Sequence, residues 1–319
     1  MSGTFPRFLL ALSLAALAVG CGKKEEPAAV AVEKTSTPQG TVDAAVASLK
    51  AGDIKALIAS QVPPKHFDKL RAEWKEDMAK DPPDEAEKQE FATMIAELTE
   101  PGAEEKMMEK LEPQIVKFEA EMAPQMPMMV GMGKGLLVSS IQQNKDLTDP
   151  QKQDAAKSID ALANWVTTTN FTDRAKAKQA VAALVAAARE LNIKTLDEAR
   201  ALDFDTAMEK SSIAFRGAKK VLDTYGFSID KMLDTVKTEV VSQTGDQAKV
   251  KVSYQMFDQP MSFETDLVQL DGRWYGKQAI AELEKAEAEP EIAPDAAVEP
   301  EAEIEAPAEP VAEPEPTQG

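Results

Sequence analysis

The sequence AKVKVSYQM, at residues 248–256, alternates apolar and polar side chains without interruption. Successive side chains of a β-strand point to opposite faces of the sheet, so this alternation predicts a strand with one buried and one polar face. Residues 238–243 supply a partner strand, and Asp271-Gly272 marks a two-residue hairpin turn before a last strand at 273–275. We therefore predict an antiparallel meander of three or four strands.

Upstream of these strands the apolar period changes from two residues to about 3.6, which predicts helices. Gly52 is expected to end the first helix and Asp53 to cap the second. Further helices are expected at 65–80, 85–99, 103–122, 125–144, 150–168, 173–191 and 205–225, with Asp149 and Thr195 as N-caps. Helices followed by a separate sheet define an α+β fold. Its body is expected at 41–285, helical over 41–235 with the sheet over 236–280.

The composition excludes several classes of protein. The 319 residues include 36 Lys or Arg and 55 Asp or Glu, for a net charge of −19, whereas nucleic-acid binding needs a basic face. Cys21 is the only cysteine and His66 the only histidine, so one chain cannot form a disulfide, a Cys/His zinc site or a Cys-His nucleophilic pair. We expect no cofactor, no nucleic-acid partner and, on balance, no enzyme activity.

The first 20 residues have the pattern of an export signal. Arg7 and the free amine provide a positive start, and an apolar stretch at 8–19 follows that is too short to span a bilayer. We expect residues 1–20 to be a signal peptide.

The end of this signal, Ala18-Val19-Gly20-Cys21, resembles the lipobox of bacterial lipoproteins. In that family a small residue precedes a cysteine that is lipidated and becomes the N-terminus, which implies a membrane anchor of acyl chains on Cys21. An ordinary secretory signal with a chance cysteine is the alternative that we weigh against it. Gly22, where inner-membrane lipoproteins of this kind carry Asp, implies the outer membrane with the body facing the periplasm.

Segments without a regular apolar period flank the body on both sides. Residues 21–40 carry the lipidated cysteine and a tether of charged residues, Ala, Pro and Thr. Residues 286–319 contain eleven acidic residues, seven prolines and no Lys or Arg, which predicts a disordered tail. The tail is either a binding segment for a cationic partner or, as we favour, a solvating extension.

Two stretches of the body resemble the ends of the nuclear-transport-factor-like or cystatin-like cone superfamily. They are VDAAVASLKAGDIKAL at 42–57 and VQLDGRWY at 268–275. The resemblance implies a helical N-terminus on a curved sheet, with a ligand cavity near Tyr254, Trp274 and Tyr275. A cavity-based hydrolase or isomerase is the third of our functional hypotheses.

A methionine cluster is the strongest compositional feature inside the body. It contains five of the fourteen methionines, at Met122, Met126, Met128, Met129 and Met132. Thioethers are soft ligands that bind Cu(I), so the cluster is a candidate metal site. Methionine also fills gaps between helices and lines apolar grooves, which is the interpretation that we favour.

Two further features carry less weight. The sequence GMGKG at 131–135 lacks the spacing and the Ser or Thr of a phosphate-binding loop, so we expect helix packing or a joint there. His66 could act as a general base beside Asp68 or Asp53, but we expect a surface histidine.

We therefore expect a lipid-anchored cell-envelope protein that acts by binding or structural contact, with an envelope protein as its possible partner. The alternative is a small-molecule or Cu(I)-binding periplasmic module.

Overall fold

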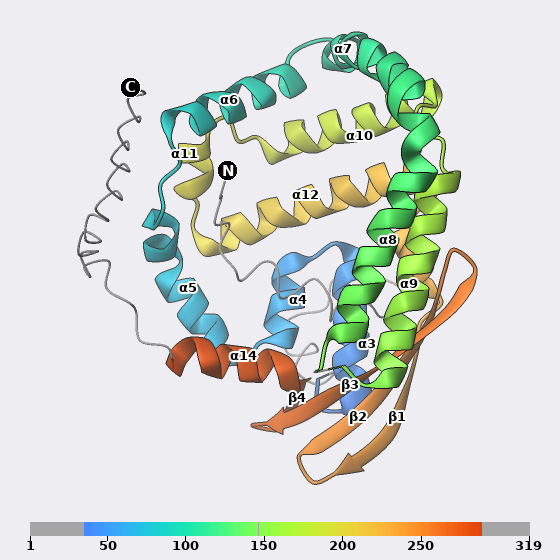
Figure 1. Cartoon of the computed structure of the whole chain (residues 1–319). Coiled ribbons are helices and arrows are strands. Elements are labelled where there is room, and N and C mark those ends of the chain that lie inside the picture. Colours follow the sequence, from blue (N-terminus) through green and yellow to red (C-terminus); the bar gives the residue numbers. More distant parts are fainter. Residues whose placement is uncertain (1–34, 146, 289–319) are drawn as a thin grey trace, which may run out of the picture.

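A computed structural model describes residues 35–145 and 147–288. Helices precede a four-stranded antiparallel sheet (Figure 1), so the α+β prediction is confirmed. The helices are α3 (Pro38–Ala51), α4 (Ile54–Gln61), α5 (Pro64–Ala79), α6 (Glu85–Thr99), α7 (Ala103–Lys117), α8 (Met126–Gln143), α9 (Asp149–Thr168), α10 (Arg174–Leu191), α11 (Leu196–Arg200), α12 (Phe204–Thr224), α13 (Ile229–Asp234) and α14 (Lys277–Ala288). The strands are β1 (Lys237–Thr244), β2 (Gln247–Met256), β3 (Gln259–Leu270) and β4 (Arg273–Gly276). The predicted signal peptide, Cys21 and the tail from residue 289 onward lie outside the described residues.

Local signals set the helix boundaries close to the predicted positions. Gly52 ends α3 in the left-handed conformation, at φ 70°, and the Asp53 carboxylate accepts the N–H of Ala56 at 2.8 Å. The predicted cap of α9 was wrong by one residue. Thr148 is the N-cap and forms a reciprocal capping box with Gln151, whereas Asp149 occupies the first helical position. A carboxylate there still faces the positive end of the helix dipole.

The sheet is a meander in the order β1-β2-β3-β4. Asp271 and Gly272 both have positive φ, at 51° and 78°, as the predicted tight hairpin between β3 and β4 requires. The sheet ends at Gly276, not at residue 280. The following residues form α14, whose Ile280 is only 6% exposed and holds this helix against the body.

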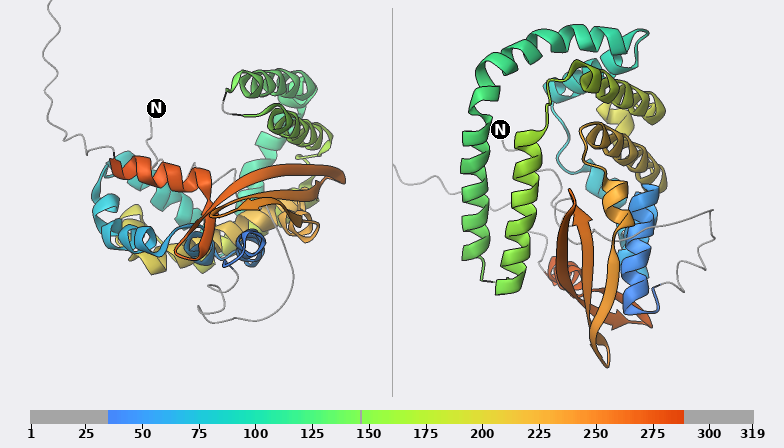
Figure 2. Two further views of the ribbon diagram at one scale, coloured as in Figure 1. Left: turned by 90° about the horizontal axis from the view of Figure 1, so that it is seen from below. Right: turned by 90° about the vertical axis from the view of Figure 1, so that its right-hand side faces the viewer.

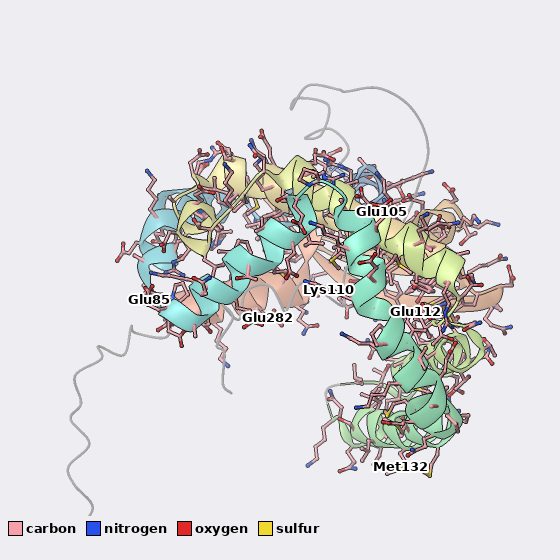
Figure 3. All side chains as sticks on the ribbon, turned by 90° about the horizontal axis from the view of Figure 1, so that it is seen from above. Glu85, Glu105, Lys110, Glu112, Met132 and Glu282 are labelled. Carbon is pink, nitrogen blue, oxygen red and sulfur yellow. The ribbon has the colours of Figure 1, made fainter. Side chains whose placement is uncertain are left out.

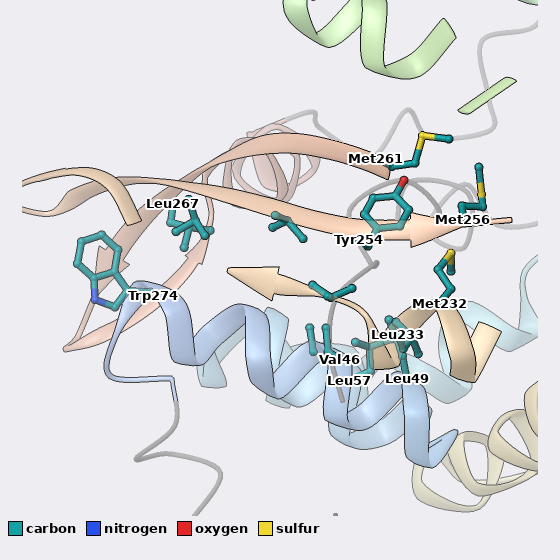
Figure 4. Packing of buried hydrophobic residues seen from close by; sticks show 14 of the residues in the cluster. Val46, Leu49, Leu57, Met232, Leu233, Tyr254, Met256, Met261, Leu267 and Trp274 are labelled. Carbon is teal, nitrogen blue, oxygen red and sulfur yellow. The ribbon is translucent and has the colours of Figure 1, made fainter. Parts of the chain in front are cut away.

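The main core lies between the sheet and the first helices. Val250 and Val252 of β2 are fully enclosed on the predicted apolar face, and α3 and α4 cover that face with Val46 and Leu57 (Figure 4). Trp274 of β4 belongs to the same cluster and is 1% exposed. The alternation at 248–256 therefore identified the buried face correctly.

The folded body begins before residue 41. Thr35 is fully buried, its carbonyl accepts the N–H of Trp274 at 3.0 Å, and its hydroxyl accepts a hydrogen bond from Arg273 Nε at 3.0 Å. Helix α3 starts at Pro38, with Thr37 as its N-cap. The last residues of the predicted tether are thus part of the body, because they pair with β4 far along the chain.

The remaining helices form layers that lead away from the main core. Helix α12 packs on α4, α10 packs on α12, and α6 and α7 pack on α10 (Figure 1). At one end of these layers Phe204 of α12 lies edge-on between Phe67 and Trp74 of α5, with ring centroids 5.4 and 5.6 Å away. Edge-to-face contacts of this kind add to the burial of the rings.

Gly217 lets α10 and α12 approach closely. A Cβ atom at this position would lie 2.6 Å from Cβ of Ala187 on α10, which is closer than two methyl groups can approach. The glycine is therefore a packing requirement of this helix pair.

We expect Gly217→Ala to lower the free energy of unfolding by about 1–3 kcal/mol, because the two helices must move apart to admit the methyl group. The matched control is Gly133→Ala on α8, where a Cβ would meet nothing within 4 Å. That variant should gain about 0.5–1 kcal/mol from the better helix propensity of alanine. Chemical denaturation measures both values. A stabilising effect in both variants would show that α10 and α12 do not approach this closely.

Candidate functional site

A bend after α7 directs α8 away from the helical layers. Pro113 removes one backbone donor inside α7, and a π-helical turn at Phe118–Met122 and a 3-10 turn at Ala123–Gln125 follow before α8 begins. Arg174 at the start of α10 spans this bend, since its Nη2 atom donates to Glu112 and Glu119, each at 3.0 Å. The hydrogen bond from Arg174 is the main reason that the pKa of Glu119 lies below its ordinary value.

Helices α8 and α9 form an antiparallel arm beside the sheet (Figure 2). Helix α9 packs on β3, with the buried Ala161 reaching the main core. Helix α8 lies along α9, where Lys134 forms a 2.8 Å ion pair with Asp160 and Lys152 donates to the carbonyl of Gln142 at 3.0 Å. The arm thus has α9 as its inner helix and α8 as its outer helix.

The outer helix exposes apolar side chains along its length. None of its 18 residues is buried, and Met128, Met132 and Leu136 are 61%, 64% and 73% exposed. Met129 and Leu137 are also exposed, and Lys134 is the only charged residue of α8. Monomeric proteins rarely expose a continuous apolar surface without a functional reason. This surface is our candidate functional site, and Figure 3 shows Met132 on it, at the opposite end of the molecule from Glu85.

The predicted methionine cluster falls on this surface. Met122, Met128, Met129 and Met132 are exposed, and Met126 is half-buried. Four of the five side chains are therefore exposed and do not fill gaps between the described helices. Cu(I) binding stays a prediction.

The predicted cavity residues lie in the packed interior. Tyr254, Trp274 and Tyr275 are at most 7% exposed, and burial raises the pKa of both tyrosines. Trp274 and Tyr275 point to opposite faces of β4, as neighbours in a strand must. Two surface hollows, one over β1 and β2 and one along α6, contain none of the three. A ligand site on these aromatic residues stays a prediction.

The remaining candidate residues take ordinary positions. Residues 131–135 lie inside α8, so they form no phosphate-binding loop, and His66 is half-exposed in the first turn of α5. Within residues 35–145 and 147–288, no group of three or more His, Cys, Asp or Glu side chains is placed to hold a metal ion. In the same residues no helix has the length and hydropathy to cross a bilayer.

Comparison with known proteins finds no match. No protein-family model, no curated protein and no solved structure matches the chain. The similarity to the cone superfamily therefore remains a resemblance of two short stretches.

Sequence reasoning missed Leu136 and Leu137 as part of the site. The available signal was that α8 is apolar on every side, which is typical of a helix buried in a core. Only the tertiary structure shows that α8 has a neighbour on one side.

We expect the chain to show no tight Cu(I) site. Met128 and Met129 lie within one turn of Met132, but the three thioethers are 61%, 45% and 64% exposed, and the described residues place no group of three or more His, Cys, Asp or Glu side chains to hold an ion with them. A chromogenic Cu(I) chelator under reducing conditions measures the affinity, with all five methionines replaced by Leu as the control. Affinity tighter than about 1 nM that the Leu variant loses would contradict this expectation.

Proposed function

We propose that this chain is a lipid-anchored protein of the bacterial outer membrane that acts by contact with another protein in the periplasm. The observation that carries the contact role is the apolar surface of α8, where Met128, Met132 and Leu136 are each more than half exposed. Contact with a partner would remove these apolar side chains from water, and the burial of apolar surface is the main driving force of protein association.

The anchor rests on the sequence around Cys21, which has the order of a lipoprotein signal. Thr35, the first described residue, contacts the body and lies 14 positions after Cys21 in the sequence. Fully extended, a segment of this length reaches on the order of 50 Å. An anchor on Cys21 would therefore keep the body close to the membrane and leave α8 free to meet partners there.

Two other functions have less support. A small-molecule or Cu(I)-binding module would need the methionines or the aromatic residues to converge on one ligand, and the aromatic residues are packed in the core. A hydrolase or isomerase would need an acid-base pair beside a cavity, and Tyr254 and Trp274 border neither of the two hollows described above.

We expect Cys21→Ala to abolish labelling of the chain by an alkynyl fatty acid in the native host, because no other residue can carry the thioether. The wild type, expressed at the same level, is the control and should be labelled. The variant should accumulate as uncleaved precursor. Equal labelling of both proteins would contradict the anchor.

We expect a photo-cross-linking amino acid at position 132 to capture protein in the native envelope, because Met132 lies on the exposed surface of α8. The matched control is the same amino acid at Glu105, an exposed position of α7 that Figure 3 shows well away from Met132. Mass spectrometry identifies the products. The absence of any protein adduct at position 132, with cross-linker incorporated, would contradict the contact role.

A further inference from the structure

We propose that the outward face of α8 binds the same face of a second copy of this chain, so that two α8–α9 arms pair into a dimer. This inference rests on the proposed contact function and names the partner. Its basis is the shape of the outward face, its lack of charge and its size.

The outward face carries a ridge and a groove side by side. Side chains four residues apart follow one another along a helix, so Met128, Met132 and Leu136 form a ridge of large side chains. The neighbouring row, again with a spacing of four residues, consists of Gly131, Gly135 and Ser139. Because glycine has no side chain and serine a small one, we expect this row to form a shallow groove beside the ridge.

A surface with both features is complementary to itself. In a two-fold symmetric pair, each helix inserts its ridge into the groove of the other, because both copies present the same patch. The half-buried Met126, Val130 and Ile141 lie on the opposite side of α8, toward α9. The face proposed to pair is therefore the one that residues 35–145 and 147–288 leave uncovered.

Among the described residues, no neighbour requires glycine at the glycine positions of α8. A Cβ atom at Gly131 or Gly135 would meet nothing within 4 Å, in contrast to Gly217. Glycine inside a helix is less stable than alanine, so the monomer would fold better with alanine at both positions. Close approach of a second helix backbone explains why small residues occupy them.

The charge distribution favours a second copy over a membrane surface. Helix α8 has a single charged residue, Lys134, which is paired with Asp160 of its own arm. Two copies of this face thus meet without repulsion. Helices that lie on lipid headgroups carry Lys or Arg on the polar side and aromatic residues at the boundary, and α8 has no aromatic residue and no second cation.

The area suits a weak dimer. An 18-residue helix is about 27 Å long and about 10 Å wide, so two such faces cover about 540 Å² in total, less than half of the area of about 1,200 Å² at which standard interfaces begin. Anchoring of both copies to one membrane raises their local concentration and would favour pairing.

The test is disulfide cross-linking of the full chain in the membranes of its host, with Met132→Cys as the reporter. Met132 lies near the middle of the ridge, so it meets its own copy whether the helices cross in parallel or antiparallel directions. A lipidated Cys21 has no free thiol, and it is the only natural cysteine. Diamide should therefore convert Met132→Cys into a disulfide-linked homodimer, while Glu105→Cys and the wild type stay monomeric.

A second pair of variants tests the groove. In the Met132→Cys background, Gly131→Leu with Gly135→Leu fills the groove and should reduce the dimer about tenfold or more. Gly133→Ala, which changes a glycine outside that row, should leave the yield unchanged. Leucine is a better helix former than glycine, so the thermal midpoint of the double variant should not fall.

Each outcome decides the proposal. A missing homodimer, or a homodimer that the filled groove does not reduce, overturns it. A cross-link from position 132 to a different protein overturns the second copy as the partner but leaves the proposed contact function in place. A disulfide dimer of the wild-type chain would instead show a free Cys21 thiol and contradict the lipid anchor.

Discussion

The contact between α3 and the last strands holds the two ends of the described chain together. The hydroxyl of Thr41 donates to the carbonyl of Trp274 at 3.0 Å, across 233 residues of sequence. Around this contact the side chains of α3 and α4 cover the apolar face of β2. All helices from α5 to α12 are therefore inserted between two halves of one core. Closing a loop of this length costs chain entropy, which the burial of side chains in the core must offset.

A buried lysine reinforces the same contact from the side of the inserted helices. Lys219 of α12 is buried, and its Nζ atom donates to the carbonyls of Leu49 and Lys50 at the end of α3 and pairs with Asp230 at 2.5 Å. A cation at this place adds a donor to the carbonyls of the last turn of α3 and complements the negative end of the helix dipole. The sequence shows Lys219 only as one charge on an amphipathic helix, because its partners lie on α3 and α13.

The parts of the fold that were predictable are those with local causes. Gly52, Asp53 and the hairpin pair Asp271-Gly272 act through the conformation of one or two residues, and each was predicted in its observed role. Two of the errors have non-local causes: Thr35 joins the body because the backbone of β4 pairs with it, and Ile280 extends the body because α14 packs against β3 and β4. The candidate site also has a non-local cause, since the apolar pattern of α8 does not indicate which of its sides α9 covers.

The glycines fall into two groups: some are required by backbone conformation or close helix packing, and those of α8 are required by neither among the described residues. Gly52 needs its positive φ, and Gly217 needs the space that Ala187 would otherwise occupy. Gly131 and Gly135 have neither reason, yet they stand in the middle of the helix with the most exposed apolar side chains. A helix of that composition gains little stability from its own backbone, and α9 covers only one side of it. The outer side of α8 is therefore the part of the described structure for which the proposed pairing of two arms would supply packing that α9 does not.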